Sequence, residues 1–525
     1  MAKKYDAIII GAGHNGLINA AYLARAGKKV LVLERRHLVG GATVTEEIFP
    51  GFKFSVFSYV VSLLRPQIIQ ELQLPRFGLT ILPLESTLTP LPNGDYLYRD
   101  SDHYRSLRDI ARHSARDAEA YEEYNREMYF MAKAAQPIID NPAPDPASLK
   151  PGELFRLARL GKNMLNMGPE RLYTLAKLLT MSAADFVEQW FEAEPLIATL
   201  SASGIIGTNM GPRSPGTAYV LLHHYMGDID GAFRAWGFPK GGTGAVAEAI
   251  ARSARAFGAE IRCEAAVERV IIRNGRARGV VLNSGEEITC NVVVSSLDPK
   301  QTFLKLVDPA LMPEELVQDI RRFNIRGSSA KVNLALDALP EFSCMPGKGN
   351  HLRGAISISP SLDYMERAYD DAKYGNIPRR PYIDIIIPSM IDPDMAPPGK
   401  HVMSCFVQWA PYELNQGTWD ERREELGDNV IDTLEEYIPN IKSIILGRQV
   451  LSPWDIEQMT GLSEGNIFQG ELTLSQLLFL RPAPGYARYR TPIHNYYQCG
   501  SGTHPGGGIM GASGRFAAMA ILRSR

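Results

Sequence analysis

Residues 7–16 read Ala-Ile-Ile-Ile-Gly-Ala-Gly-His-Asn-Gly. The apolar run at the start of this stretch predicts a buried parallel strand. Gly11, Gly13 and Gly16 follow at the spacing GxGxxG, and a helical pattern comes after them. In such a loop the first glycine permits a tight turn, the second a close approach to a pyrophosphate, and the third close packing of helix on strand. The phosphates would lie at the helix N-terminus, where free amides and the helix dipole favour negative charge.

A second apolar run, residues 30–33, ends in Glu34. An acid about 20 residues beyond the glycine loop accepts hydrogen bonds from a ribose diol in dinucleotide-binding units. The glycine motif alone does not distinguish FAD from NAD. Gly40 and Gly41 follow the acid and permit a second close approach to the pyrophosphate, which is typical of FAD-binding folds that resemble glutathione reductase. The sequence therefore predicts FAD.

Composition excludes several classes of protein. The chain has 525 residues, enough for two to four domains, and its net charge of −2 gives no electrostatic basis for nucleic-acid binding. The five cysteines form no CxxC pair, so neither a metal site nor a redox disulfide is indicated, and scattered thiols suit a reducing compartment. The first strand leaves no room for a targeting segment, and no run of about 18 apolar residues occurs. We expect a cytoplasmic enzyme, soluble or peripheral to a membrane.

Breaks along the chain predict its organisation. A proline-rich connector at 141–152 precedes a helical portion near 153–192, and strand patterns at 330–336 and 382–387 predict a second sheet. The dinucleotide pattern resumes after residue 238 with a glycine-rich turn, a helix and a hairpin at Asn274-Gly275. We predict an α/β fold with a discontinuous, Rossmann-like FAD-binding domain of the glutathione reductase type and a mixed α+β substrate-binding domain. The predicted boundaries are 1–60, 238–300 and 490–525 for FAD, and 61–237 and 301–489 for substrate.

Six motifs carry a resemblance to a known family, at residues 11–17, 33–36, 39–42, 236–242, 481–482 and 499–508. Together they resemble the phytoene desaturase and amine oxidase group of flavoproteins over most of the chain. Within it the chain is most similar to a carotenoid desaturase-like subgroup that is named after a pyridine nucleotide-disulfide oxidoreductase domain. The residues do not support that name, because the chain has neither a cysteine pair nor a second GxGxxG.

The resemblance implies an FAD site built from both ends of the chain. It implies that the first glycine loop lies at the pyrophosphate, Glu34 at the adenosine ribose, and the backbone of Val267 at the adenine. The C-terminal glycine-rich loop would follow the ribityl chain, and the amides of Ile509 and Met510 would face the flavin pyrimidine edge, where a helix N-terminus stabilises the reduced ring. The residues assigned to FAD are Gly11, Gly13, His14, Asn15, Gly16, Glu34, Arg35, Arg36, Gly40, Gly41, Ala42, Val267, Gly500, Gly502, Thr503, Gly508, Ile509 and Met510.

Two residues are candidates for catalysis. Lys331 resembles the lysine of amine oxidases that holds a water against flavin N5, and the alternative is a surface lysine on a strand edge. His504 either faces the flavin or holds its glycine loop through a backbone bond. His223 and His224 could bind a metal or substrate, but a pair without further ligands is usually structural. Cys499 could bind flavin covalently or be a packed thiol.

The helical pattern at 154–165 places Arg156, Arg159 and Lys162 opposite apolar residues. Such a helix either lies on anionic lipid or covers a core. Peripheral membrane contact is therefore left open, and the sequence does not indicate an oligomeric state.

We interpret the chain as an FAD-dependent oxidoreductase that transfers hydride from a small, lipophilic substrate to flavin N5. One alternative is an oxygen-using amine oxidase with an aromatic cage from Trp409, Tyr412, Phe468 and Tyr489. A second is an FAD-binding scaffold with little turnover, and a third is redox-neutral isomerisation or saturation on the same fold.

The single GxGxxG generates a prediction about the electron donor. Because the chain shows no second dinucleotide motif, NADH and NADPH should not reduce the bound flavin directly. Stopped-flow mixing of each with the anaerobic holoenzyme should leave the oxidised-flavin absorbance unchanged over seconds. Bleaching at a rate that supports turnover would contradict the prediction.

Overall fold

The glycine loop lies at the carboxyl end of the first strand of a seven-stranded sheet. The computed structural model describes residues 4–229 and 232–524. The strands run in the order β11-β2-β1-β14-β13-β12, and β20 pairs with the distal end of β14. The pairs β11–β2, β2–β1, β1–β14 and β14–β20 are parallel, whereas β12, β13 and the start of β14 are antiparallel. The bounds are β1 (Tyr5–Ile10), β2 (Val30–Leu33), β11 (Glu260–Arg262), β12 (Val267–Arg273), β13 (Arg276–Leu282), β14 (Glu287–Ser295) and β20 (Tyr496–Gln498).

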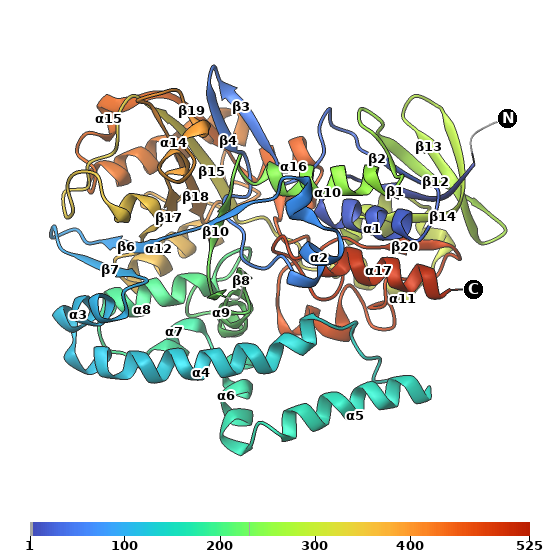
Figure 1. Ribbon diagram of the computed structural model, residues 1–525, viewed down its shortest axis with the longest axis horizontal. Helices are drawn as coiled ribbons and strands as arrows, with labels where there is room; N and C mark the ends of the chain where they lie inside the picture. Colours follow the sequence, from blue (N-terminus) through green and yellow to red (C-terminus); the bar gives the residue numbers. More distant parts are fainter. Residues whose placement is uncertain (1–3, 230–231, 525) are drawn as a thin grey trace.

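The central strands of this sheet are buried on both faces, which explains their continuous apolar runs. Ala7 and Ile9 point into one core, whereas Ile8 and Ile10 point into another. The first core is covered by α1 (His14–Arg25), α10 (Gly244–Ala256) and α17 (Ala512–Arg523), and the second by α11 (Glu314–Arg322) and the hairpin strands (Figure 1).

The two ends of the chain join at α1. The Nδ2 of Asn15 donates to Ser501 Oγ at 3.1 Å, and the Nδ2 of Asn19 donates to the carbonyl of Gly514 at 3.0 Å. A Cβ at Gly514 would overlap the carbonyl oxygen of Asn15, so α17 approaches α1 at backbone distance. The last helix therefore belongs to the same unit as the first.

A second seven-stranded sheet has the order β19-β15-β18-β17-β16-β6-β7. One face is apolar and packs on α14 (Trp419–Glu435), next to which α12 (Leu362–Lys373) and α15 (Ile441–Ile444) lie (Figure 1). The opposite face of its central strands looks towards the first sheet. The bounds are β6 (Ser86–Pro90), β7 (Tyr96–Asp100), β15 (Ser329–Leu336), β16 (Ala355–Ile358), β17 (Tyr382–Ile386), β18 (His401–Gln408) and β19 (Ile445–Leu451).

A layer of helices lies along one side of the two sheets, at the bottom of Figure 1. It comprises α3 (His103–His113), α4 (Ala115–Ile139), α5 (Pro151–Leu165), α6 (Pro169–Thr180), α7 (Ala183–Val187), α8 (Glu194–Ser201) and α9 (Thr217–Tyr225). The remaining elements are short: β3 (Thr45–Phe49), β4 (Phe52–Ser55), β5 (Ile81–Pro83), β8 (Asp228–Ile229), β9 (Ala232–Phe233), β10 (Gly237–Pro239), α2 (Pro66–Glu71), α13 (Pro388–Ile391) and α16 (Pro453–Thr460).

Helix α5 projects from this layer and covers little. Glu153 is its only buried residue, and Arg488 binds that carboxylate. Leu154, Phe155 and Leu165 are 47%, 69% and 73% exposed. Of the two interpretations of this helix, coverage of a core is therefore wrong for most of its length.

The predicted fold class is confirmed, and the hairpin about Asn274-Gly275 has the predicted strands. The helical portion near 153–192 is divided among α5, α6 and α7. The domain boundaries stay a prediction. No helix within residues 4–229 and 232–524 combines the length and the apolarity needed to cross a membrane.

Two helical glycines form a matched pair for a stability test. Gly514→Ala should destabilise the protein by about 1–3 kcal/mol, because the methyl group overlaps the backbone of α1. Gly161→Ala on α5 meets nothing within 4 Å and removes the flexibility of glycine, so it should not lower stability. Thermal unfolding of both holoproteins compares them, and equal losses would contradict the close packing of α17 on α1.

Candidate functional site

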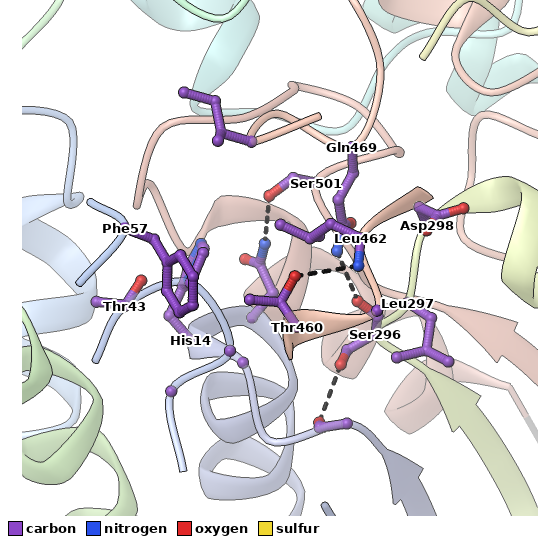
Figure 2. A pocket seen from close by; sticks show the side chains of 18 of the residues that line it. His14, Thr43, Phe57, Ser296, Leu297, Asp298, Thr460, Leu462, Gln469 and Ser501 are labelled. Atoms are coloured by element: carbon purple, nitrogen blue, oxygen red, sulfur yellow. Dashed lines mark hydrogen bonds between the residues drawn. The ribbon is translucent and has the colours of Figure 1, made fainter. Parts of the chain in front are cut away.

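A large cavity, about 550 Å³ in volume, runs from the glycine loop to the second sheet. Figure 2 shows that side chains from distant segments surround it, among them His14, Ser296, Gln469 and Ser501. Of the residues assigned to FAD, twelve line it: Gly11, Gly13, His14, Asn15, Glu34, Arg35, Gly40, Gly41, Ala42, Val267, Gly508 and Ile509.

The three glycines of the first loop have the roles that their spacing predicts. Gly11 has a φ of +89°, which favours glycine. A Cβ on Gly13 would meet nothing within 4 Å, so this backbone borders open space in the cavity. A Cβ on Gly16 would overlap the carbonyl oxygen of Gly11 and approach Ser296 Oγ to 2.9 Å. Gly16 therefore packs the helix on the strand and is itself outside the cavity wall.

The second glycine pair packs directly on the first loop. The amide of Gly40 donates to the carbonyl of Ala12 at 2.9 Å, and an added Cβ on Gly41 would lie 3.4 Å from the Cα of Gly13. Both glycines have positive φ, +129° and +62°. The loop around a pyrophosphate would thus have a backbone wall on two sides.

Glu34 is 7% exposed at the end of β2 and lines the cavity. Its Oε2 accepts the amide of Ala12 at 2.8 Å and its Oε1 the amide of Arg36 at 3.0 Å. These bonds hold the carboxylate still, and each oxygen retains a lone pair for a ribose hydroxyl. Arg36 forms an ion pair with Glu46 at 2.9 Å and lies outside the wall.

His14 begins α1 and carries a buried Nε2 for which the described residues supply no partner. Burial lowers the pKa of His14 to about 4, so the ring is neutral. The first amides of α1 also lack partners within the helix and face the cavity. A polar ligand at this helix N-terminus would satisfy these groups, which is the arrangement that dinucleotide phosphates occupy.

The C-terminal loop contributes fewer cavity residues than predicted. Gly508 and Ile509 line the cavity, but Gly500, Gly502, Thr503 and Met510 lie behind its wall. A Cβ on Gly500 would lie 2.6 Å from the carbonyl oxygen of Ser296, so this glycine is needed for packing. Ser501, which lies between the assigned glycines and was not predicted, lines the cavity instead.

The buried guanidinium of Arg481 holds this loop in place. It donates to the carbonyl of Ser501 at 2.9 Å and to those of Gly470 and Glu471 at 3.0 Å each. Burial lowers the pKa of Arg481 to about 10. The motif at residues 481–482 therefore supports the cavity from behind.

Neither predicted catalytic residue lines the cavity. His504 Nε2 lies 3.0 Å from the carbonyls of Ile138 and Asn141, so it ties the glycine loop to the end of α4. Lys331 is 1% exposed, which rules out a surface lysine. Its Nζ lies 5.2 Å from the ring centroid of Tyr59, and Tyr59 does line the cavity.

The cavity end away from the glycine loop is aromatic. The ring of His224 stacks on Trp236 at 5.8 Å and on Phe468 at 6.1 Å, and all three residues line the cavity. Of the four residues expected to form an aromatic cage, only Phe468 is among them. Trp409, Tyr412 and Tyr489 bond elsewhere, to Met210, Glu457 and His504.

Two further candidates have structural surroundings. His223 is buried behind the wall and its Nε2 lies 3.2 Å from the carbonyl of Gly507. Cys499 is fully buried in the core of the first sheet, where burial raises the pKa of its thiol. Across residues 4–229 and 232–524, no three His, Cys, Asp or Glu side chains gather as metal ligands would.

Comparison with known proteins places the chain in a family. The family described as "Flavin containing amine oxidoreductase" matches residues 16–522. The chain belongs to this family. A rat protein, "Pyridine nucleotide-disulfide oxidoreductase domain-containing protein 2", is 42% identical over 100% of this chain and 94% of its own length. The predicted resemblance is therefore confirmed.

More distant relatives have diverse names. A limonene dehydrogenase polypeptide of Castellaniella defragrans is 26% identical over 99% of this chain and 95% of its own length. The solved structure of a putrescine oxidase with bound putrescine shares the fold, with a TM-score of 0.61, 17% identity and full coverage of both chains.

The chain is an FAD-dependent oxidoreductase, and the cavity residues fit the cofactor. The open space at Gly13, the orphaned His14 Nε2 and the acid at the end of β2 match the pyrophosphate and ribose of a dinucleotide. When bound, FAD accepts two electrons, and the protein supplies binding, orientation and electrostatics. The individual FAD contacts remain predictions.

Gly13 separates binding of FAD from folding. Its φ of −64° is open to any residue, so Gly13→Val should fold, while the side chain occupies the space of the pyrophosphate. FAD affinity should fall by about 1–3 kcal/mol, roughly tenfold to a hundredfold. Gly16→Val should instead lower the folding stability, because its side chain meets the Gly11 carbonyl. Unchanged flavin affinity in Gly13→Val, measured by fluorescence titration of the apoprotein, would refute the assigned turn.

Proposed function

We propose that the protein oxidises a small, apolar, isoprenoid-like hydrocarbon by removing a hydride from carbon to the bound FAD. The observation that carries this proposal is the chemical division of the cavity. The wall residues from outside the segments of the first sheet include no carboxylate and no lysine or arginine; the apolar ones are Phe57, Val60, Val61, Leu63, Ile206, Trp236, Phe406, Leu462, Ile467 and Phe468.

The carboxylates of the wall lie at the other end. Glu34, Glu268 and Asp298 follow or belong to strands of the first sheet, where the nucleotide is predicted. An ammonium substrate buried in the aromatic end would leave its charge without an ionic partner, which is costly. His224 supplies no charge either, because burial lowers its pKa to about 4. An alkene or alkane loses little on entering such a space and gains from burial of its apolar surface.

The relatives support the same class of substrate. The limonene dehydrogenase polypeptide is named for a terpene hydrocarbon and matches nearly the whole chain. The putrescine oxidase likeness is below the identity at which it bears on substrate and concerns the fold alone. The amine oxidase alternative also expects Lys331 and the aromatic cage at the cavity, and neither lines it in the predicted form.

Peripheral membrane contact also stays a proposal. The outward face of α5 combines Leu154, Phe155 and Leu165 with the exposed Arg159 and Lys162. Apolar side chains next to basic ones on one exposed helix face suit a surface of anionic lipid.

Anaerobic bleaching of the flavin tests the substrate class. The holoenzyme is mixed with terpene hydrocarbons, limonene among them, and with aliphatic and aromatic amines such as putrescine and benzylamine. We expect loss of the oxidised-flavin absorbance with hydrocarbons and none with amines. Bleaching by amines alone would overturn the proposal in favour of an amine oxidase, and bleaching by neither would favour a scaffold.

A matched pair of variants locates the substrate. Ile206→Asp places a charge in the apolar end and should slow bleaching by a hydrocarbon at least about tenfold, because a buried unpaired carboxylate costs several kcal/mol. Ile206→Leu keeps the apolar volume and should bleach at a rate near that of the native enzyme. Equal rates in both would place the hydrocarbon elsewhere.

A further inference from the structure

Three side chains stand in one row across the centre of the second sheet. Lys331 on β15 pairs with Phe406 on β18, and Phe406 pairs with Asp384 on β17. Directly paired residues of antiparallel strands point to the same face. The neighbouring residues Val332, Cys405 and Ile385 point into the apolar core on the other face. The cavity-side face of this sheet therefore carries an ammonium and a carboxyl group on either side of a phenyl ring.

Tyr59 covers this row and connects it to the cavity. Its ring stacks on Phe406 with centroids 5.3 Å apart, and both rings line the cavity. Its hydroxyl donates to Asp384 Oδ2 at 2.6 Å, and the Lys331 ammonium lies 5.2 Å from its ring centroid. A residue of the cavity wall is thus hydrogen-bonded to a carboxylate that is not in the wall.

The electrostatics of this group suit proton transfer near neutral pH. Burial raises the pKa of Asp384 to about 6, although the hydrogen bond from Tyr59 and the charge of Lys331 act to lower it. Burial lowers the pKa of Lys331 to about 7, and its Nζ donates to Ser404 Oγ. The other titratable groups facing Asp384 are Tyr382 and Cys405, and burial raises the pKa of both phenol and thiol above the neutral range.

The proposed oxidation needs a proton acceptor in the apolar end of the cavity. Removal of hydride from a carbon next to a double bond leaves an allylic cation, and a new double bond forms only when a neighbouring carbon loses a proton. Among the described wall residues outside the segments of the first sheet, Tyr59 and His224 are the ionisable ones. His224 is stacked between two rings and its Nδ1 lies 2.9 Å from the carbonyl of Val220. Tyr59 alone connects to a buried carboxylate.

We propose that Tyr59 and Asp384 together accept the substrate proton, an inference that rests on the proposed hydrocarbon oxidation. The C–H bond next to the allylic cation breaks and its electron pair becomes the new π bond. The proton passes to the Tyr59 hydroxyl oxygen while the phenolic proton moves to Asp384 Oδ2. The two electrons leave with the hydride to FAD, so the step leaves Tyr59 neutral and Asp384 protonated. The stacked rings of Tyr59 and Phe406 stabilise the transient cation through their π faces.

Lys331 then has a role different from the predicted one. It does not touch the cavity, and its charge keeps Asp384 ionised and ready to accept a proton. Lys331 is therefore a positioning residue, whereas Tyr59 contacts the substrate.

Conservative variants separate proton transfer from support of the fold. Tyr59→Phe keeps the stacked ring, and Asp384→Asn keeps an oxygen that accepts the Tyr59 hydroxyl but cannot take its proton. Both should bind FAD as the native enzyme does and slow hydrocarbon bleaching by about 10²–10⁴-fold, the usual share of a general base. Tyr382→Phe, two residues before Asp384 and outside the wall, is the control and should leave the rate unchanged. Native-like rates in Asp384→Asn would overturn the proposal and leave Asp384 a structural residue.

The pH dependence gives a second readout. In the native enzyme the bleaching rate should fall as pH falls through about 6, because a protonated Asp384 cannot accept the phenolic proton. Asp384→Asn should lack this limb. A retained limb would assign the ionisation to another group and refute the pair.

A substrate-free measurement separates this inference from the proposed function. The midpoint potential of the bound flavin is followed from pH 5 to 9 with dithionite as reductant. Negative charge arriving in the cavity should draw a proton onto the Asp384–Lys331 group, so the native potential should change more steeply with pH near 6 to 7 than that of Asp384→Asn. Identical slopes would show that the pair does not communicate with the flavin. If no hydrocarbon bleaches the enzyme but the slopes differ, the substrate class is wrong while the proton-accepting pair stands.

Discussion

The contact between Gly16 and the carbonyl of Gly11 sets the position of the remaining site. Because no side chain intervenes, α1 starts directly above the end of β1. Ser296, which follows β14, donates to the same carbonyl at 2.9 Å, and Asn15 of the first turn reaches Ser501 at 3.1 Å. Three segments that are hundreds of residues apart in the sequence thus meet at one helix N-terminus. A larger residue at position 16 would move the helix away and separate all three.

The cavity that results has two chemically different ends. At the first sheet its wall is backbone, glycine and a few acids and bases, which suits a charged dinucleotide. At the second sheet its wall is aliphatic and aromatic, and the polar groups stand one layer behind it. This arrangement lets charged residues influence the reacting centre without being solvated by a substrate, since interactions between charges are stronger where water is excluded.

The strands of the second sheet explain how charge came to lie there. Along β15 the residues alternate between Ala330, Val332 and Leu334, which enter the apolar core, and Lys331 and Asn333, which face the cavity side. The cost of burying Lys331 is offset by Ser404, Asp384 and the face of Tyr59. The same polar face would be exposed to water in an isolated sheet. Here the first sheet and the loop after β4 cover it, and a row of buried ionisable groups results.

Local patterns determined the first half of this description. The spacing of Gly11, Gly13 and Gly16, the acid at position 34 and the turn at Asn274-Gly275 depend on backbone geometry within a few residues, so the sequence alone predicted the fold class, the cofactor and the nucleotide end of the cavity. Contacts between distant segments decided the rest. Gly500 and Thr503 belong to a glycine-rich motif, but only packing against residues 296–297 shows that they support the wall while Ser501 forms it. Lys331 has the sequence context of a cofactor-facing lysine, and Tyr59 has no motif at all. Which of the two reaches the cavity depends on how the loop after β4 lies across three strands from the other half of the chain, and no local pattern of residues encodes that placement.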